Sequence, residues 1–196
     1  MNAHYDLTLI DNPEVACAVL FSAVFNRFHR DIVTNDLVGR IAVDFPNATK
    51  NSAVANVGNV VRLYGAKNDL ETMKQSSLQW RGLQGRFRLS EIVVVEPGEK
   101  RQRWVRTRPH SFTLEAIERL VRRRVKRMSK NTETPDELRI MLQGKDDEWK
   151  RALVQTPHIH VTSFSTGCKF PLFFQRAKTG PVSELEKLNS YGLCGQ

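Results

Sequence analysis

One histidine in this sequence has a position that would suit proton transfer. His29 lies near the end of a helix expected from about Asn12 to Asp31, outside the apolar stripe of that helix. Because imidazole exchanges a proton near neutral pH, His29 in an RNA-binding protein could accept the proton of a 2′-hydroxyl and let that oxygen attack the adjacent phosphate. On position alone, an ordinary surface histidine is the commoner explanation.

Hydroxyl side chains gather in a predicted turn between two strands. Ser163, Ser165 and Thr166 are followed there by Gly167. Hydroxyls and exposed backbone amides can orient a ribose or a phosphate. The same residue types are also common in ordinary turns, so both interpretations stay open.

The spacing of acids and histidines argues against a metal centre. His158 and His160 lie two apart on a predicted strand and point to one face, but no matching third ligand is evident. Asp146, Asp147 and Glu148 are consecutive, so they cannot converge on one ion from one face, which disfavours a two-metal nuclease. We therefore expect a protein that uses neither a metal ion nor another cofactor.

The basic residues are concentrated in one stretch. Between Lys100 and Lys130 there are twelve Lys and Arg residues against two Glu, whereas the rest of the chain sums to −1 in a protein of net charge +9. A helix is expected from Thr113 to Lys130, with an apolar stripe on one side and cations on the other. The cations of that side are Arg119, Arg122, Arg123, Lys126, Arg127 and Lys130.

This charge pattern predicts a polyanionic partner. Like charges on one helix face destabilise the helix unless an anion binds, and the arginine side chain suits phosphate. A solvated helix face is the ordinary explanation of a charge run, but such runs normally mix both signs. We therefore expect the stretch to bind nucleic acid.

The predicted elements of residues 1–97 follow the order strand, helix, strand, strand, helix, strand. Strands are expected at residues 4–10, 41–45, 59–64 and 86–89, with a further extended piece at 92–95. The order predicts an α+β protein with an N-terminal ferredoxin-like (βαββαβ) domain at residues 1–97. The aromatic signature that lets such a sheet stack RNA bases is missing, so the sheet face is not expected to bind bases.

For residues 98–196 we expect a second domain, a basic α/β RNA-binding domain. It contains the arginine-rich helix, the hydroxyl-rich turn at Ser163 to Gly167, and Tyr191. A capping box from Thr134 to Glu137 starts a further helix that should reach about Gln143. Strands are expected at residues 158–163, 168–174 and 190–193.

The cysteines and the apolar runs indicate a cellular location. Three widely spaced cysteines without a CxxC pair predict neither a disulfide framework nor a zinc site, and they favour a reducing, cytoplasmic setting. The longest apolar run, residues 16–25, is too short and too interrupted to span a membrane, and no signal peptide is evident. We expect a cytoplasmic protein with no membrane partner.

Six motifs, taken in order along the chain, resemble those of the CRISPR RNA-processing endoribonucleases of type I-F systems. They are HYDLTL at residues 4–9, VFNRFHRDIV at 24–33, RIAVDFP at 40–46, RRRVKR at 122–127, SFSTGCKF at 163–170 and SYGL at 190–193. The resemblance implies a metal-independent enzyme that binds the stem-loop of a CRISPR repeat RNA and cuts at the 3′ base of the stem, giving a 2′,3′-cyclic phosphate. It also implies that the mature crRNA stays bound and that other subunits of the type I-F interference complex are partners.

The resemblance assigns roles to single residues. His29 matches the catalytic histidine, and Ser163 matches the serine that positions the 2′-hydroxyl, with Ser165 as its neighbour at the site. Tyr191 matches the active-site tyrosine. The residues expected to contact RNA are Arg106, Arg108, Arg119, Arg122, Arg123, Arg124, Lys126, Arg127 and Phe170.

Two of these RNA contacts carry more specific expectations. Arg106 matches an arginine that reads a guanine edge near the base of the stem. Arg108 stands where the family often has glutamine, two residues further along the same extended segment. Both side chains can therefore point to the same side.

Two other functions are compatible with the sequence. The protein could be a non-catalytic hairpin or double-stranded RNA-binding protein, in which His29 is an ordinary surface residue. A basic ribosome-associated or DNA-binding protein is the weaker choice, because no helix-turn-helix spacing supports it.

Overall fold

The computed structural model describes residues 1–49, 57–96, 98–107, 114–127, 134–142, 156–163, 166–177, 179–181 and 188–194, with the backbone alone at 114–117, 126 and 127. It is an α+β structure with antiparallel sheets. The chain divides into two compact units, Met1–Thr107 with Pro157–Gln196, and Arg108–Thr156. The predicted ferredoxin-like domain at residues 1–97 and RNA-binding domain at 98–196 divide the chain differently, and they stay a prediction.

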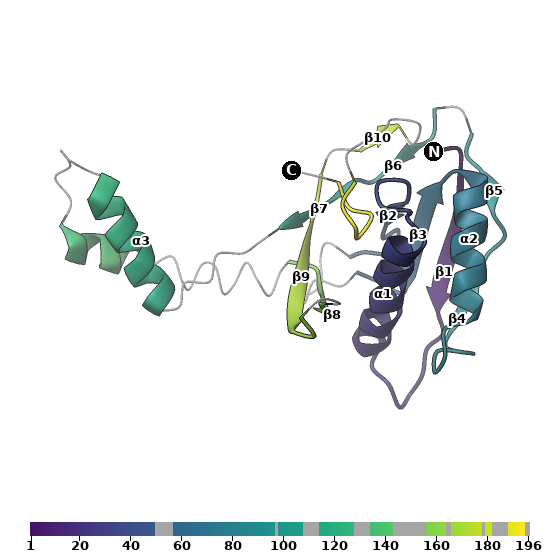
Figure 1. The fold of residues 1–196 in the computed structure, drawn as a ribbon, viewed down its shortest axis with the longest axis horizontal. Coiled ribbons are helices and arrows are strands. Elements are labelled where there is room, and N and C mark those ends of the chain that lie inside the picture. Colours follow the sequence, from purple (N-terminus) through teal and green to yellow (C-terminus); the bar gives the residue numbers. More distant parts are fainter. Residues whose placement is uncertain are drawn as a thin grey trace. The chain divides into compact units, whose positions relative to one another are not determined.

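The first unit begins with the predicted order of elements (Figure 1). The elements are β1 (Ala3–Leu9), α1 (Cys17–Thr34), β2 (Ala42–Asp44), β3 (Val60–Gly65), α2 (Lys67–Leu78) and β4 (Phe87–Leu89), followed by β5 (Val93–Val94). The strands form one antiparallel sheet in the order β2-β3-β1-β4, and β5 also pairs with β1. Both helices lie against the same face of this sheet.

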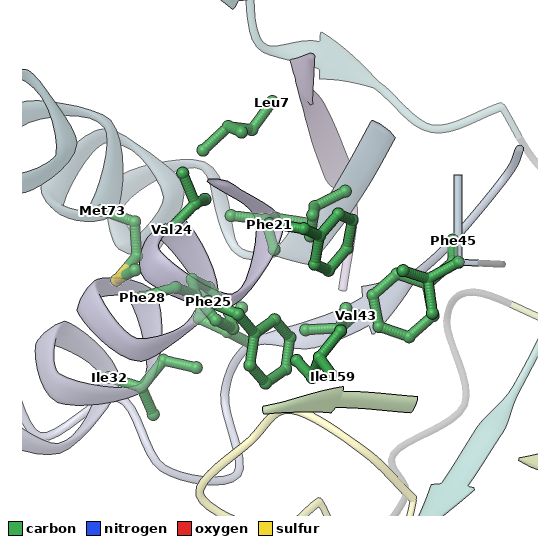
Figure 2. Packing of buried hydrophobic residues seen from close by; sticks show 14 of the residues in the cluster. Leu7, Phe21, Val24, Phe25, Phe28, Ile32, Val43, Phe45, Met73 and Ile159 are labelled. Carbon is green, nitrogen blue, oxygen red and sulfur yellow. The ribbon is translucent and has the colours of Figure 1, made fainter. Parts of the chain in front are cut away.

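Alternation along β1 places its apolar side chains under the helices. Tyr5, Leu7 and Leu9 are buried, whereas the intervening residues are only partly covered. From the other side, α1 contributes an apolar stripe that includes Phe21 and Phe25, and these side chains fill the space above the sheet (Figure 2). The period of two in the strand and of 3.6 in the helix therefore builds one core.

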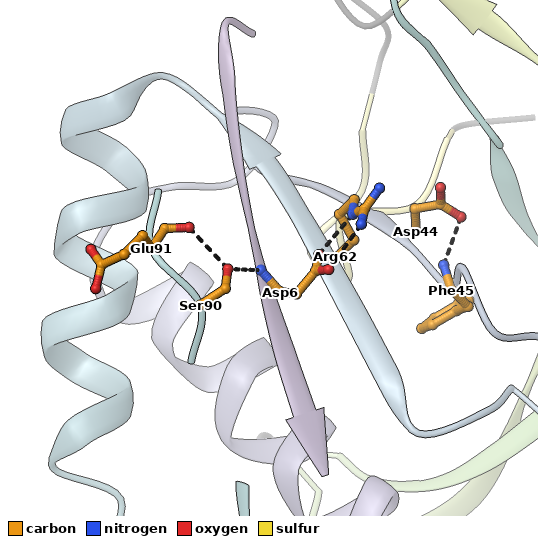
Figure 3. A network of polar contacts seen from close by, with 6 residues as sticks. All are labelled: Asp6, Asp44, Phe45, Arg62, Ser90 and Glu91. Carbon is orange, nitrogen blue, oxygen red and sulfur yellow. Dashed lines mark hydrogen bonds and ion pairs between the residues drawn. The ribbon is translucent and has the colours of Figure 1, made fainter. Parts of the chain in front are cut away.

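On the opposite face of the sheet, a network of polar contacts ties strands together (Figure 3). The Arg62 guanidinium donates two hydrogen bonds to the Asp6 carboxylate, from Nε at 2.7 Å and from Nη2 at 2.9 Å. Asp6 and Arg62 are directly opposite each other in the β1–β3 register. The Asp6 backbone N–H donates to Ser90 Oγ, which extends the network to the segment after β4.

The first helix begins later than the sequence predicts. Asn12 Oδ1 accepts hydrogen bonds from the backbone N–H groups of Glu14 and Val15, which closes a turn. The helix starts only at Cys17 and runs to Thr34. The predicted start at Asn12 is wrong because this asparagine side chain stabilises a local turn in place of capping the helix.

A second sheet in the first unit brings together strands from both halves of the chain. It has the order β7-β9-β8 and consists of β7 (Trp104–Thr107), β8 (His158–Thr162) and β9 (Lys169–Arg176). Phe25 of α1 packs against Phe174 of β9, with ring centroids 6.0 Å apart, so the two sheets share the core. A further pair, β6 (Lys100–Arg101) with β10 (Gly180–Pro181), is also antiparallel.

The predicted strand at residues 190–193 is wrong. Residues 190–192 form a turn, in which the Gly192 N–H donates to the Asn189 backbone carbonyl oxygen. Gly192 has a φ of 69°, a left-handed conformation that favours glycine and interrupts an extended chain. The two bridges at this end of the chain flank the turn, at Leu188 and Cys194.

The second unit is described as two helices. α3 (Leu114–Arg127) is followed by a helix at residues 135–142. The capping box is confirmed, because the Thr134 N–H donates to Glu137 Oε2 and the Glu137 N–H donates to Thr134 Oγ1. Val121 is buried with Leu138 and Leu142, whereas Val125, which the sequence assigns to the same apolar stripe, is exposed.

Candidate active site

His29 is held at the end of α1 by contacts with the turn at residues 189–193. Its Nδ1 lies 2.8 Å from the Ser190 carbonyl oxygen, and its ring stacks on Tyr191 with centroids 4.0 Å apart and planes at 20°. A carbonyl oxygen only accepts hydrogen bonds, so Nδ1 must be protonated in this contact. In the neutral ring Nε2 is then an unprotonated acceptor, which is the state of a general base.

The turn that supports His29 is itself fastened to the core. Asn189 Oδ1 accepts hydrogen bonds from the N–H groups of Tyr191 and Leu193, at 2.9 and 3.3 Å. The Gly192 carbonyl accepts the N–H of Val43 at 2.9 Å, which joins the turn to β2. A Cβ on Gly192 would meet the Val43 side chain at 2.7 Å, so both the φ angle and the close approach require glycine.

Tyr191 links His29 to two of the expected RNA-binding residues. The Arg106 guanidinium lies 5.6 Å from the centroid of the Phe170 ring and 5.7 Å from that of Tyr191. Burial raises the pKa of the Tyr191 hydroxyl, and the positive charge of Arg106 partly opposes this. The hydroxyl is therefore neutral at pH 7 and can donate a hydrogen bond to an oxyanion.

Ser163 and His29 both line a pocket of about 510 Å³. It follows β8, and its N–H donates to the Cys168 carbonyl oxygen across the turn that leads into β9. Ser163 Oγ accepts the N–H of Thr166 at 3.3 Å, and Gly167 has the left-handed φ of 67° that closes the turn. Ser165 lies outside the described residues.

Two polar residues of α1, for which the sequence alone predicts no role, fix the position of β8. Asn26 Oδ1 accepts the Thr162 N–H at 2.7 Å, and Ser22 Oγ accepts the His160 N–H at 3.2 Å. These side chains occupy the edge of β8 where a neighbouring strand would otherwise pair. Ser22, Asn26 and His29 are spaced i, i+4 and i+7, a polar stripe that could have signalled a second contact face of α1.

Arg106 is positioned by the strand that carries it. Two residues earlier, the Trp104 indole Nε1 donates to the buried Asp44 carboxylate at 2.8 Å, which ties β7 to β2. The Asp44 carboxylate also accepts the Phe45 N–H at 2.7 Å (Figure 3). Burial raises the pKa of Asp44, although these hydrogen bonds oppose the shift.

Comparisons with known proteins identify the family of this chain. The model of a family described as CRISPR-associated protein (Cas_Csy4) matches residues 4–196. The chain belongs to the Cas_Csy4 family. The chain is also similar to the CRISPR-associated endonuclease Cas6/Csy4 of Pseudomonas aeruginosa (strain UCBPP-PA14), with 28% identity over 202 residues, 98% of this chain and 95% of the relative. The family resemblance inferred from the six motifs is thereby confirmed.

In this Cas_Csy4 protein the arginine-rich helix is confirmed as a helix, and its role stays a prediction. Arg119, Arg122, Arg123 and Arg124 are exposed. The side chains of Lys126 and Arg127, and the whole of Arg108, lie outside what the structure describes.

The helix at residues 135–142 is joined to α3 by an ion pair between Arg139 and Glu118. Arg139 donates to both carboxylate oxygens of Glu118, from Nε at 2.6 Å and Nη2 at 3.1 Å. This contact, with a smaller effect of Arg122, lowers the pKa of Glu118. The negative charge of Glu118 is thus compensated mainly by Arg139 of the neighbouring helix.

The described residues include no group of three or more His, Cys, Asp and Glu side chains arranged to hold a metal ion. His158 and His160 do lie on one face, with ring centroids 5.7 Å apart, and His158 packs beside Phe173 at 5.0 Å. Within the described part of the chain, no helix combines the length and the apolar character needed to cross a membrane.

Proposed function

We propose that this protein is a sequence-specific endoribonuclease that binds the stem-loop of a CRISPR repeat RNA and cuts it at the 3′ base of the stem. One observation carries the catalytic part of the proposal: the Ser190 carbonyl oxygen holds His29 Nδ1, which leaves Nε2 as a proton acceptor beside a pocket that Ser163 also lines. Membership of the Cas_Csy4 family and the name of the relative, an endonuclease, support the substrate class.

The proposed reaction is an intramolecular transesterification. His29 Nε2 accepts the proton of the 2′-hydroxyl, and the 2′ oxygen forms a bond to the adjacent phosphorus. The bond between phosphorus and the 5′ oxygen of the next nucleotide breaks, and that oxygen takes up a proton. The products are a 2′,3′-cyclic phosphate on the retained RNA and a 5′-hydroxyl on the other fragment, and no metal ion takes part.

Several neighbours would assist this step. Ser163, with Ser165 beside it, would hold the 2′-hydroxyl in line with the phosphate, since small displacements of reacting groups are costly in rate. The neutral Tyr191 hydroxyl would donate to a phosphate oxygen, and its ring would keep His29 in place. Phe170 would pack against the nucleotide at the cut.

The RNA stem would be recognised by arginines from both units. Arg106 would read a guanine edge, Arg108 would lie beside it, and the exposed arginines of α3 would bind phosphates in the major groove. Residues 1–97 would form a ferredoxin-like platform that carries His29, and residues 98–196 the basic RNA-binding domain. The mature crRNA would stay bound while the protein joins the other subunits of the type I-F interference complex.

The test uses the purified full chain and the repeat RNA. We expect cleavage by the unaltered protein, also in excess EDTA, and a loss on the order of 10²–10⁴-fold for His29→Ala with hairpin affinity nearly unchanged. A substrate with a single 2′-deoxy nucleotide just upstream of the cut should bind and stay whole. Cleavage of the deoxy substrate, or a normal rate for His29→Ala, would exclude the mechanism. Binding without cutting by the unaltered protein would favour a non-catalytic RNA-binding protein.

A further inference from the structure

The pocket beside His29 and Ser163 has a basic lining that the proposed reaction does not use. The described residues that line it are Ala23, Asn26, Arg27, His29, Arg30, Thr162, Ser163 and Gly167. Arg27 and Arg30 are cationic, and no acid is among these residues. Arg27 is only partly exposed, so water solvates its charge less fully than that of an open surface arginine. An anion in the pocket would compensate this charge.

The lining of the pocket is distinct from the cluster of Arg106, Phe170 and Tyr191. The Arg106 guanidinium lies near the rings of both Phe170 and Tyr191, and Tyr191 stacks on the His29 ring. None of these three is among the described residues that line the pocket. His29 therefore has an aromatic and cationic cluster at its ring face and a separate basic pocket on the side of α1 and the β8–β9 turn.

An RNA strand that is cut internally needs space in the protein on both sides of the cut. The pocket volume of about 510 Å³ falls within the range of roughly 300–1,000 Å³ typical of small-ligand sites, so it can take a nucleotide. If Arg106 holds the upstream side at the base of the stem, the downstream nucleotide must leave the reacting phosphate in another direction. The Arg27 pocket also borders both His29 and Ser163.

We infer that this pocket binds the RNA nucleotide on the 3′ side of the cut, with Arg27 contacting its phosphate. The inference rests on the proposed function and adds a binding subsite for the leaving strand. Arg27 and Arg30 are three residues apart on α1, so both can face the same RNA strand. Arg27 is the residue chosen for the test. Arg30 already has another contact within the described structure.

The experiment compares two RNAs that differ only downstream of the cut. Both carry a 2′-deoxy nucleotide at the attacking position, so neither is cleaved, and they end either directly at the cut or several nucleotides beyond it. We expect Arg27→Gln to weaken binding of the extended RNA by on the order of tenfold and to leave the short RNA unchanged. The slope of log Kd against log salt should flatten by about 0.7 for the extended RNA alone, because the variant no longer neutralises one phosphate of the single strand.

Three controls separate the possible outcomes. Arg88→Gln, at an exposed arginine of β4 outside the pocket, should change neither RNA, and Arg27→Lys should keep most of the salt slope. Thermal unfolding must show that the Arg27 variants fold. Equal losses on both RNAs, or no loss on either, would overturn the subsite while cleavage by the unaltered protein still upheld the proposed function. Failure of the unaltered protein to bind either hairpin would overturn both.

Discussion

Asn26 and Thr162 join the helix of the candidate base to the strand of the candidate serine: the Asn26 side-chain Oδ1 accepts the backbone N–H of Thr162 at 2.7 Å. His29 lies less than one turn further along α1, and Ser163 directly follows Thr162. This hydrogen bond is therefore one of the contacts that set the distance between the two proposed catalytic groups. Asn26 acts through other residues, so it is a positioning residue.

The first prediction concerns this bond. Asn26→Ala should lower the single-turnover cleavage rate by on the order of tenfold to a hundredfold and leave hairpin Kd nearly unchanged, because the serine turn shifts relative to His29. Asn26→Asp keeps the Oδ1 acceptor but loses the Nδ2 hydrogen bond to the Ser22 carbonyl oxygen, so it should recover only part of the rate. Asn35→Ala is the matched control, since Asn35 donates only to the backbone of its own helix, at Asp31. A parallel loss of rate and thermal stability in all three variants would indicate a purely structural role.

The second prediction concerns base reading by Arg106. An arginine fork on a guanine edge contributes about 1–3 kcal/mol of discrimination. Arg106→Ala should therefore weaken binding of the native repeat more than binding of a repeat with the stem-base pair exchanged. Arg106→Lys keeps the charge but loses the fork, so it should restore the phosphate attraction and not the base preference. Equal losses of affinity on both RNAs would assign Arg106 to a phosphate.

The third prediction concerns the exposed arginines of α3. Replacing Arg122 and Arg123 together with alanine should weaken hairpin binding and flatten the slope of log Kd against log salt by about 0.9 for each phosphate that the variant no longer neutralises. Exposed Arg81 of the first unit is the comparison, and Arg81→Ala should leave the slope unchanged. An unchanged slope in the double variant would mean that α3 is not the docking surface.

The fourth prediction concerns pH and stability. The pKa of Asp44 is raised by burial, so its ionised form is less favourable in the folded than in the unfolded protein. This destabilising contribution is absent below the unfolded pKa and grows as pH rises through the folded pKa. The free energy of unfolding of the unaltered protein, relative to Asp44→Asn, should therefore fall as pH rises above about 4, the ordinary pKa of an aspartate.

Urea unfolding of both proteins across this pH range measures the effect. Taking the difference between the two proteins cancels the titration of all other groups and any constant change in hydrogen bonding at residue 44. A difference that rises with pH would mean that the Trp104 and Phe45 hydrogen bonds outweigh burial in setting the pKa of Asp44.

Local patterns were sufficient for β1 and for the helix at residues 135–142. The alternation at Tyr5, Leu7 and Leu9 predicts β1 because a half-buried strand needs a period of two. The capping box of Thr134 and Glu137 predicts the helix at 135–142, since both hydrogen bonds are local. The six motifs predict the family, and the matching family model confirms it.

Other features of the site were decided only by the tertiary structure. The Asn12 and Ser190 segments were assigned wrongly because a turn competes there with the helix or strand, and its side-chain hydrogen bonds are invisible to a periodic pattern. The contacts of Asn26 with Thr162 and of His29 with Ser190 join residues more than a hundred positions apart. No spacing rule predicts such pairs, because they exist only after the shared aromatic core has brought α1, β8 and the C-terminal turn together.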